Sequence, residues 1–203
     1  MTVEKGVDWG RRGPLPEDGI VVADDAEARA VVEAARRSGE PPPPLGLTGG
    51  DLCRTLGGRG DVARLRSEQA VTFTVDLGSV LVDGRHHWFV AHLVARRSWW
   101  WGRVVAVMNA QWLGDWDLGP RAHPGDGLLD VSDGELSIRD RLKARSRLPT
   151  GTHVPHPGIR TRRVSAWQTE LDPALDVWLD GTRIGRARNL SVRVEPDALT
   201  VVV

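Results

Sequence analysis

VVAVMNAQWLGDWDLGPRAHPGDGLLDV, residues 104–131, carries the clearest evidence of the fold of this chain. It opens on a β-branched run that predicts a strand over residues 103–108, and its glycines and prolines then predict a succession of tight turns. Asp126 and Asp130 lie in the last of these turns, together with several backbone carbonyl groups. Oxygen-rich loops of this kind suit Mg²⁺ or Ca²⁺, and it is equally open that the two carboxylates serve the turn alone.

The flanking sequence from residue 70 onward predicts an antiparallel β-sheet or sandwich. Apolar and polar residues alternate there at the spacing of half-buried strands, and the aspartate-glycine pairs at 83–84 and 180–181 are typical of hairpin turns. One helix is predicted in this half, over residues 137–148. The predicted strands cover residues 71–75, 80–82, 87–90, 164–171, 175–179, 182–185, 190–194 and 199–203.

The segment before residue 71 alternates strands with helices, which is the pattern of a parallel α/β layer. After an irregular lead-in over residues 1–18, a strand at 19–23 precedes a helix that Asp24 and Asp25 cap and Gly39 ends. A strand at 45–47, a glycine turn and a helix at 52–56 follow. The predicted fold class is therefore α+β: a truncated α/β (Rossmann-like) unit, residues 1–70, packed on an antiparallel β-sandwich, residues 71–203.

Charge and composition exclude several classes of function. The 203 residues include 27 basic and 27 acidic side chains, so no basic surplus favours a nucleic-acid partner. The single Cys53 cannot form a disulfide within the chain, as expected in a reducing compartment. No apolar stretch has the ~18 residues of a membrane span, and the segment MTVEKGVDWG at the start lacks the apolar run of a signal peptide. We therefore expect a cytoplasmic location.

Two further stretches are candidates for binding. Residues 48–51, TGGD, lie between a strand and a helix, where backbone N–H groups can cradle a phosphate, although short loops use the same residues for structural reasons. Trp99, Trp100 and Trp101 are bracketed by arginines. Indole and guanidinium groups favour the lipid headgroup region, whereas burial in the sandwich core or a protein contact would use the same side chains. The six histidines match no zinc motif.

The motifs after the strand at 103–108 follow a recognisable order: an asparagine, a glycine turn, a proline and an aspartate-glycine-leucine loop. This order resembles that of the bacterial diacylglycerol kinase and sphingosine kinase-like lipid kinases, within the NAD kinase superfamily. Segments 151–159 (GTHVPHPGI), 177–185 (VWLDGTRIG) and 190–203 (LSVRVEPDALTVVV) are similar to the family's later loop, closing hairpin and terminal strand. The motif residues are Asn109, Gly114, Pro120, Asp126, Gly127, Leu128 and Asp130.

The resemblance extends into the segment before residue 71 in a reduced form. Where the family has a glycine-glycine-aspartate-glycine-threonine nucleotide loop, this chain has DDAE at 24–27, and the family's second phosphate turn is shortened to residues 48–51. The family's first strands and helices have no counterpart. ATP binding is therefore not favoured. The nucleotide-binding positions that the resemblance implies are Asp24, Asp25, Thr48, Gly49, Gly50 and Asp51.

The resemblance also implies catalytic and metal positions. Active relatives have aspartate-glycine-glutamate at the hairpin where this chain has Asp180, a glycine and Thr182, and that glutamate is the proposed general base. A threonine hydroxyl cannot accept the proton near neutral pH, which predicts a loss of about 10²–10⁴-fold in rate. A structural Mg²⁺ is implied at the Asp126 side chain and at the backbone carbonyls of His123 and Leu128.

These features predict a catalytically degenerate lipid kinase-like protein that binds a lipid, a nucleotide or a partner protein. The alternative is an active ATP-dependent lipid kinase that phosphorylates a diacylglycerol-like hydroxyl, with Asp24 or Asp25 in the nucleotide loop and Asp180 as the base. A second copy of the chain or a partner protein is expected to cover the shortened sheet. Contact through Trp99–Trp101 would place the protein at the inner face of the membrane.

Overall fold

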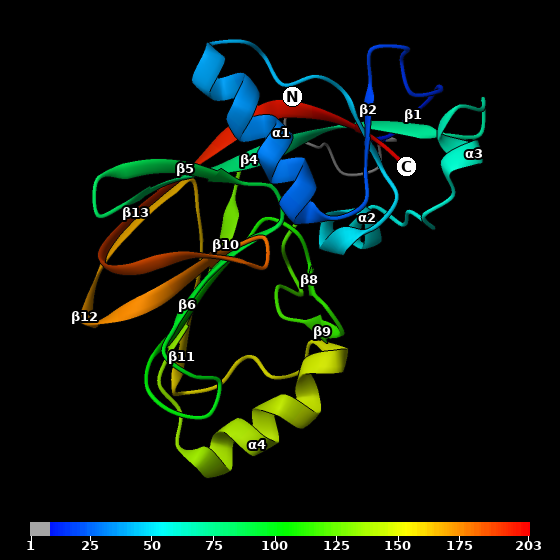
Figure 1. Ribbon diagram of the computed structural model, residues 1–203. Coiled ribbons are helices and arrows are strands. Elements are labelled where there is room, and N and C mark those ends of the chain that lie inside the picture. The colour runs from blue at the N-terminus through cyan, green and yellow to red at the C-terminus, as the bar shows by residue number, and fades with distance from the viewer. Residues whose placement is uncertain (1–8) are drawn as a thin grey trace.

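The computed structural model describes residues 9–203. Its amino-terminal unit is a short parallel arrangement of strands and helices, which lies across the top of the molecule in Figure 1. The strand β1 pairs with the sandwich strand β4, so part of the predicted irregular lead-in is ordered on the sheet. The elements of this unit are β1 (Arg11–Arg12), β2 (Ile20–Val22), α1 (Asp25–Ser38), β3 (Leu45–Leu47), α2 (Gly50–Thr55) and α3 (Val62–Leu65).

Helix α1 begins and ends at the predicted residues for the expected reasons. The Asp24 carboxylate accepts a hydrogen bond from Glu27 N at 2.9 Å, and the Glu27 side chain accepts one from Ala23 N at 2.7 Å, so each satisfies a backbone donor at the helix start. Gly39 ends the helix with a φ of 78°, the left-handed conformation that glycine adopts without strain.

The remainder of the chain is mostly antiparallel strand, as predicted. Several predicted short strands are continuous: β12 and β13 run through register shifts between Glu170 and Leu175 and between Glu195 and Leu199. The strands are β4 (Val71–Val82), β5 (Arg85–Phe89), β6 (His92–Arg96), β7 (Val104–Met108), β8 (Trp112–Leu113), β9 (Trp116–Asp117), β10 (Leu129–Gly134), β11 (Ile159–Val164), β12 (Ala166–Leu179) and β13 (Thr182–Val202).

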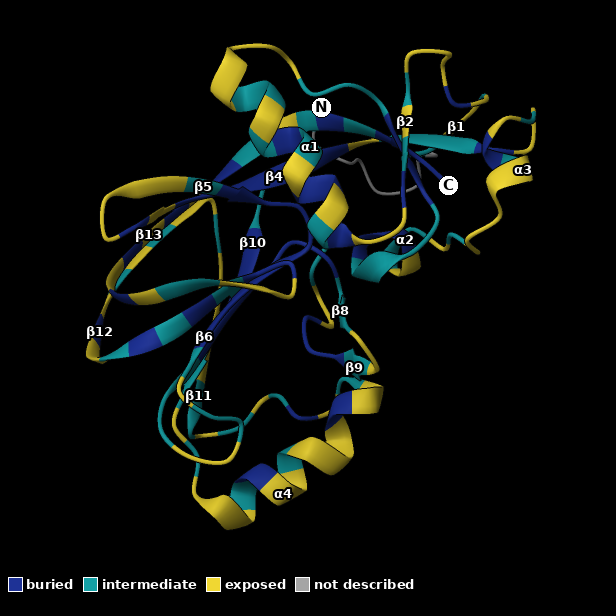
Figure 2. Ribbon diagram, in the orientation of Figure 1, coloured by how far each residue is buried: buried dark blue, intermediate teal, exposed yellow. Residues whose placement is uncertain are grey.

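One sheet connects both parts of the molecule. Its main path runs β1-β4-β13-β12-β6-β7-β10-β11, with β5 on β4 and β2-β3 joined to β13. The strands of this curved sheet surround a shared apolar core that includes Phe89 of β5, Val107 of β7 and Leu129 of β10, and Figure 2 shows the buried positions running along the strand interiors. The β-sandwich is thus formed by a sheet that closes over its own core.

The amino-terminal unit shares strands and core with the sandwich. Strand β3 pairs in parallel with the end of β13, and Val22, Leu47 and Leu52 belong to the same apolar cluster as Leu77 and Val201. The two predicted units are therefore joined by a continuous hydrogen-bonded sheet. Among the residues that the structure describes, no helix is both long and apolar enough to cross a membrane.

The predicted helix of the carboxy-terminal half is α4 (Ile138–Arg147), capped by Ser137 and followed by the 3₁₀ turn η1 (Leu148–Thr150). It lies at the lower end of the molecule in Figure 1. The tryptophan loop between β6 and β7 lies beside it. Core burial, one of the alternatives for this loop, does not apply to Trp100 and Trp101, which keep 43% and 57% of their surface exposed.

Candidate functional site

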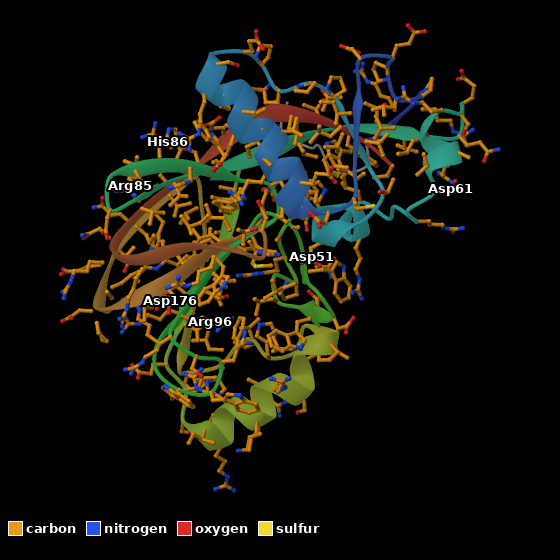
Figure 3. The ribbon with its side chains drawn as sticks, in the orientation of Figure 1. Asp51, Asp61, Arg85, His86, Arg96 and Asp176 are labelled. Atoms are coloured by element: carbon orange, nitrogen blue, oxygen red, sulfur yellow. The ribbon has the colours of Figure 1, made fainter. Side chains whose placement is uncertain are left out.

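A cavity of about 410 Å³ lies where α1, α2 and the sandwich strands meet. It contains most of the aspartates that the sequence singled out, together with a histidine that it did not. Figure 3 shows Asp51 at this junction. The lining residues are Asp24, Asp25, Ala26, Gly50, Asp51, His92, Leu113, Asp180, Gly181 and Thr182.

Asp25 connects α1 to α2. It is the first residue of α1, and its carboxylate accepts hydrogen bonds from the backbone N–H groups of Asp51 and Leu52 at the start of α2. Gly50 has a φ of 91°, and a β-carbon there would lie 2.5 Å from Asp25 Oδ1, so only glycine allows this approach. Burial, followed by the nearby Asp180 carboxylate, raises the pKa of Asp25 to about 7.

The half-buried Asp51 and the buried His92 form a pair across the cavity. Asp51 Oδ2 lies 3.0 Å from His92 Nε2, and Asp51 Oδ1 accepts a hydrogen bond from Gly114 N at 2.9 Å. Burial opposes a charge on His92, but the hydrogen bond to Asp51 and the nearby carboxylates of Asp180 and Asp25 outweigh it and raise the pKa of the imidazole. No sequence motif marked His92, because its partners lie far from it in the chain, the nearest being Asp51.

The Asp180 carboxylate is fully buried and accepts three backbone hydrogen bonds. It accepts hydrogen bonds from the N–H groups of Val90, Ala91 and His92 at 2.9–3.0 Å, and Arg29 Nε lies 4.0 Å away. Burial raises the pKa of this carboxyl, against the effects of His92 and the three hydrogen bonds. Asp180 therefore fixes the conformation of the 89–92 segment beneath the cavity.

The other predicted nucleotide and catalytic positions have local structural roles or face solvent. Asp24 caps α1, and Thr48 Oγ1 donates a hydrogen bond to the Val22 carbonyl at 2.9 Å. Gly49, the residue before α2, packs against the Ala23 carbonyl. A β-carbon at Gly49 would lie 2.4 Å from that carbonyl oxygen. Thr182 begins β13 as an exposed residue at the rim of the cavity.

The predicted Mg²⁺ loop is held together by the chain's own groups. The Asp126 carboxylate accepts a hydrogen bond from Leu128 N at 3.0 Å and forms an ion pair with Arg163, and the His123 carbonyl accepts from Gly125 N at 2.8 Å. Asp76 closes the loop by accepting from Gly127 N at 2.7 Å. In this arrangement an arginine pairs with Asp126 and turn donors use the His123 carbonyl, and a Mg²⁺ at this loop stays a prediction.

A second, apolar pocket lies beneath α4. It shares no lining residue with the cavity that contains the aspartates. Its volume is about 100 Å³, and Trp99 meets Trp116 edge-on at its wall with ring centroids 5.1 Å apart. No local sequence pattern marks this pocket, because its walls come from several segments that are well separated in the chain. The lining residues are Trp99, Trp100, Val104, Ala106, Trp116, Leu118, Ser132, Gly134, Leu136, Arg141, Ala144, Arg145, Leu148, His153 and Ile159.

His153 is the notable polar group of the α4 pocket. It is 4% exposed, and neither ring nitrogen has a hydrogen-bond partner of good geometry among residues 9–203. Burial lowers the pKa of His153, although the Asp117 carboxylate and the Leu118 carbonyl act in the opposite direction. A buried imidazole with an unsatisfied donor and acceptor is costly, and a polar atom of a bound ligand could satisfy it.

Comparison with known proteins places the chain among lipid kinase-like folds. The family model for the YegS C-terminal NAD kinase beta sandwich-like domain matches residues 62–203. A putative diacylglycerol kinase from Bacillus anthracis superposes with a TM-score of 0.69 and 14% identity over 91% of this chain and 77% of its own. A second structure, of a diacylglycerol kinase from the same organism, gives a TM-score of 0.65 and 15% identity over 91% and 75%. None of the curated proteins matches the chain.

Proposed function

Since the chain belongs to the family of the YegS C-terminal NAD kinase beta sandwich-like domain, we propose that it is a lipid-binding protein that does not phosphorylate its ligand. The observation that carries this proposal is the α4 pocket, whose wall holds the buried His153 without a hydrogen-bond partner of good geometry. Mostly apolar walls with a few polar groups suit part of a lipid, because the hydrocarbon contacts the indoles while a hydroxyl or carbonyl oxygen meets the imidazole of His153.

Two features argue against phosphoryl transfer. Thr182 occupies the position where active relatives have the glutamate base, and the neighbouring Asp180 carboxylate is engaged by three backbone N–H groups. In addition, Asp24 and Glu27 replace the glycines of the nucleotide loop, and both side chains cap α1. Phosphoryl transfer depends on positioned groups around the γ-phosphate, so both changes weaken it.

The cavity between α1, α2 and the sandwich favours one other function, that of an active lipid kinase. Asp25, Asp51 and Asp180 line it together, as a site for a metal-bound nucleotide would require. In this second candidate, Asp25 serves the nucleotide and a rearranged Asp180 serves as the base. An assay for phosphorylation therefore has to accompany any assay for lipid binding.

The binding experiment measures displacement of a fluorescent fatty acid from the full chain by dioctanoylglycerol. Ala144 lines the pocket, so Ala144→Trp is expected to fill it and weaken binding by about tenfold or more, or ~1.4 kcal/mol. His153→Phe keeps the apolar contacts and removes the ring nitrogens. It should therefore weaken binding of dioctanoylglycerol, which carries a hydroxyl group. Ala30→Trp, on the exposed face of α1, is the matched control.

The phosphorylation experiment uses labelled Mg·ATP with diacylglycerol, ceramide and sphingoid base, beside an active relative. We expect lipid binding without labelled product. Labelled lipid above background would support the kinase alternative and contradict the proposal. Lipid binding that is unaffected by Ala144→Trp would remove the α4 pocket from the proposed function.

A further inference from the structure

Three side chains from three separate elements converge in the cavity between α1, α2 and the sandwich. Asp25 of α1, Asp51 of α2 and His92 of β6 each present one carboxylate or imidazole ligand atom, and these atoms lie within 4.8 Å of one another. We propose that this cluster binds a divalent transition-metal ion of the Zn²⁺ or Mn²⁺ type. The proposal is independent of lipid binding at α4, because the two sites share no lining residue.

The donor set determines the class of metal. Carboxylate oxygens alone would suit Mg²⁺ or Ca²⁺, whereas an added imidazole nitrogen shifts the preference strongly toward Zn²⁺ and also favours Mn²⁺ over Mg²⁺. His92 is buried, and its Nδ1 makes no hydrogen bond among residues 9–203. In the tautomer with its proton on Nδ1, the ring directs the lone pair of Nε2 toward Asp51 and the metal.

The charges around the cluster favour a cation. Three carboxylates, those of Asp25, Asp51 and Asp180, lie in or directly beneath the cavity, and two of them are almost fully buried. Among the described residues, Arg29 is the one arginine or lysine that forms an ion pair with any of the three. The three carboxylates outnumber the single arginine beside them, an arrangement that a bound cation balances. A divalent ion supplies the missing charge.

The ligands are already held in position by the backbone. Leu52 N donates to Asp25 Oδ1 at 3.1 Å, and Gly114 N donates to Asp51 Oδ1 at 2.9 Å. Each carboxylate retains lone pairs for a metal, because an ionised carboxylate accepts about four hydrogen bonds or coordinate bonds in total. Three protein ligands at an open cavity of about 410 Å³ leave room for water or an anionic ligand, as in zinc sites that are not purely structural.

The experiment measures metal binding to the full chain after treatment with a chelator, without nucleotide. Calorimetric titration with Mn²⁺ and Zn²⁺ is expected to give one site per chain and much weaker binding of Mg²⁺. Electron spin echo spectroscopy of the Mn²⁺ complex is expected to show modulation from an imidazole nitrogen. A site made of surface carboxylates would bind Mn²⁺ without that modulation, and such a result would overturn the proposal.

Variants test the assignment of the ligands. His92→Gln and Asp51→Asn should each weaken Mn²⁺ binding by roughly tenfold or more, and His92→Gln should also abolish the nitrogen modulation. His156→Gln, at a half-buried histidine of the loop before β11, should leave both unchanged. Circular dichroism verifies that each variant is folded. If His92→Gln is unfolded, Asp51→Asn tests the ligand assignment, because Asp51 is less buried than His92. Binding that survives both substitutions in folded protein would refute the site.

Discussion

At the scale of single residues, the buried polar groups have roles that their sequence positions concealed. Asp180 occupies a hairpin turn with a φ of 48°, which favours aspartate, asparagine or glycine, and its carboxylate turns inward to backbone N–H groups. A position that family resemblance placed beside the catalytic base is thus part of the framework. Asn109 acts similarly, donating to the carbonyls of Asp76 at 2.9 Å and Val90 at 2.7 Å.

Replacing Asp180 by alanine should destabilise the protein severely. The change leaves three buried N–H donors without an acceptor, and each such donor costs about 1–3 kcal/mol, so we expect a loss of about 3 kcal/mol or more. Urea unfolding followed by tryptophan fluorescence measures the loss. Thr182→Ala, at the exposed start of β13, is the control and should change stability by less than about 0.5 kcal/mol. An Asp180→Ala protein as stable as the parent would show that these hydrogen bonds contribute little.

His153 should make stability depend on pH below neutrality. Burial lowers its folded-state pKa beneath the ordinary 6.5, so the unfolded chain binds a proton that the folded chain does not. The stability is fully present above pH 6.5 and falls as the pH drops toward the lowered pKa, by up to about 1.4 kcal/mol per unit.

His153→Phe should remove this part of the pH dependence. The comparison is the free energy of unfolding of parent and variant in urea between roughly pH 7 and pH 5. His92 has a raised pKa and changes stability in the opposite direction, but it is common to both proteins and cancels in the difference. Parallel curves for the two proteins would contradict the assignment.

At the scale of elements, α4 and the tryptophan loop form a surface suited to an anionic bilayer. The helix sequence IRDRLKARSR has five basic residues and one acidic residue, although the whole chain is neutral. Exposed apolar side chains of α4 and the tryptophan loop lie beside these basic residues. The α4 pocket is lined by the opposite, inward-facing side of the same segments. Such a surface binds headgroups through charge and the acyl boundary through indole and aliphatic groups. The exposed apolar residues are Trp100, Trp101, Ile138 and Leu142.

We expect the full chain to bind anionic vesicles, and removing the exposed apolar groups of this surface should weaken that binding. The variant Trp101→Ala/Leu142→Ala is expected to reduce co-sedimentation with phosphatidylglycerol-containing vesicles by roughly tenfold, because both side chains lose their contact with the acyl region. Leu81→Ala, at an exposed leucine on β4, is the matched control and should sediment like the parent. Unchanged sedimentation of the double variant would exclude this surface as the membrane contact.

At the scale of the whole molecule, the amino-terminal unit completes the sandwich. Strand β3 pairs with the end of β13, β1 pairs with β4, and α1 covers β5. Figure 1 shows these elements gathered over the same end of the sandwich. Cutting the chain after Ala70 would therefore expose an apolar face as well as a sheet edge.

A fragment of residues 71–203 should fail to fold by itself. Without the amino-terminal unit, Leu77 and Val201 lose apolar partners such as Leu47 and Leu52, with which they share a core cluster. We expect aggregation, or amide resonances poorly dispersed in a proton-nitrogen correlation spectrum. A soluble fragment with native-like dispersion would establish the sandwich as an independent domain.

Self-association is a further expectation at this scale. Strand β2 pairs only with β3 in the described part of the chain, and Ile20 on it is 41% exposed. Light scattering after size-exclusion chromatography should give the mass of a dimer, and Ile20→Lys should shift it toward the monomer, because edge lysines oppose strand pairing. A monomeric parent at high concentration would contradict a homodimer and leave a partner protein as the candidate.

The local elements and their order follow from the amino-acid sequence alone. Capping residues, glycine stops and alternating strands depend on neighbours a few positions away, so α1, α4 and the strands β2, β3, β5 and β7 have bounds close to the predicted ones. The longer strands β4, β12 and β13 each join shorter predicted ones, and β6, β10 and β11 are not predicted. Family motifs located Asp25, Asp51 and Asp180, which the fold does bring to one cavity. Three arrangements emerge only in the folded molecule: His92 joins these aspartates, Asp180 faces the backbone, and α4 covers a pocket containing His153. They depend on contacts between segments far apart in the chain, which no local spacing encodes.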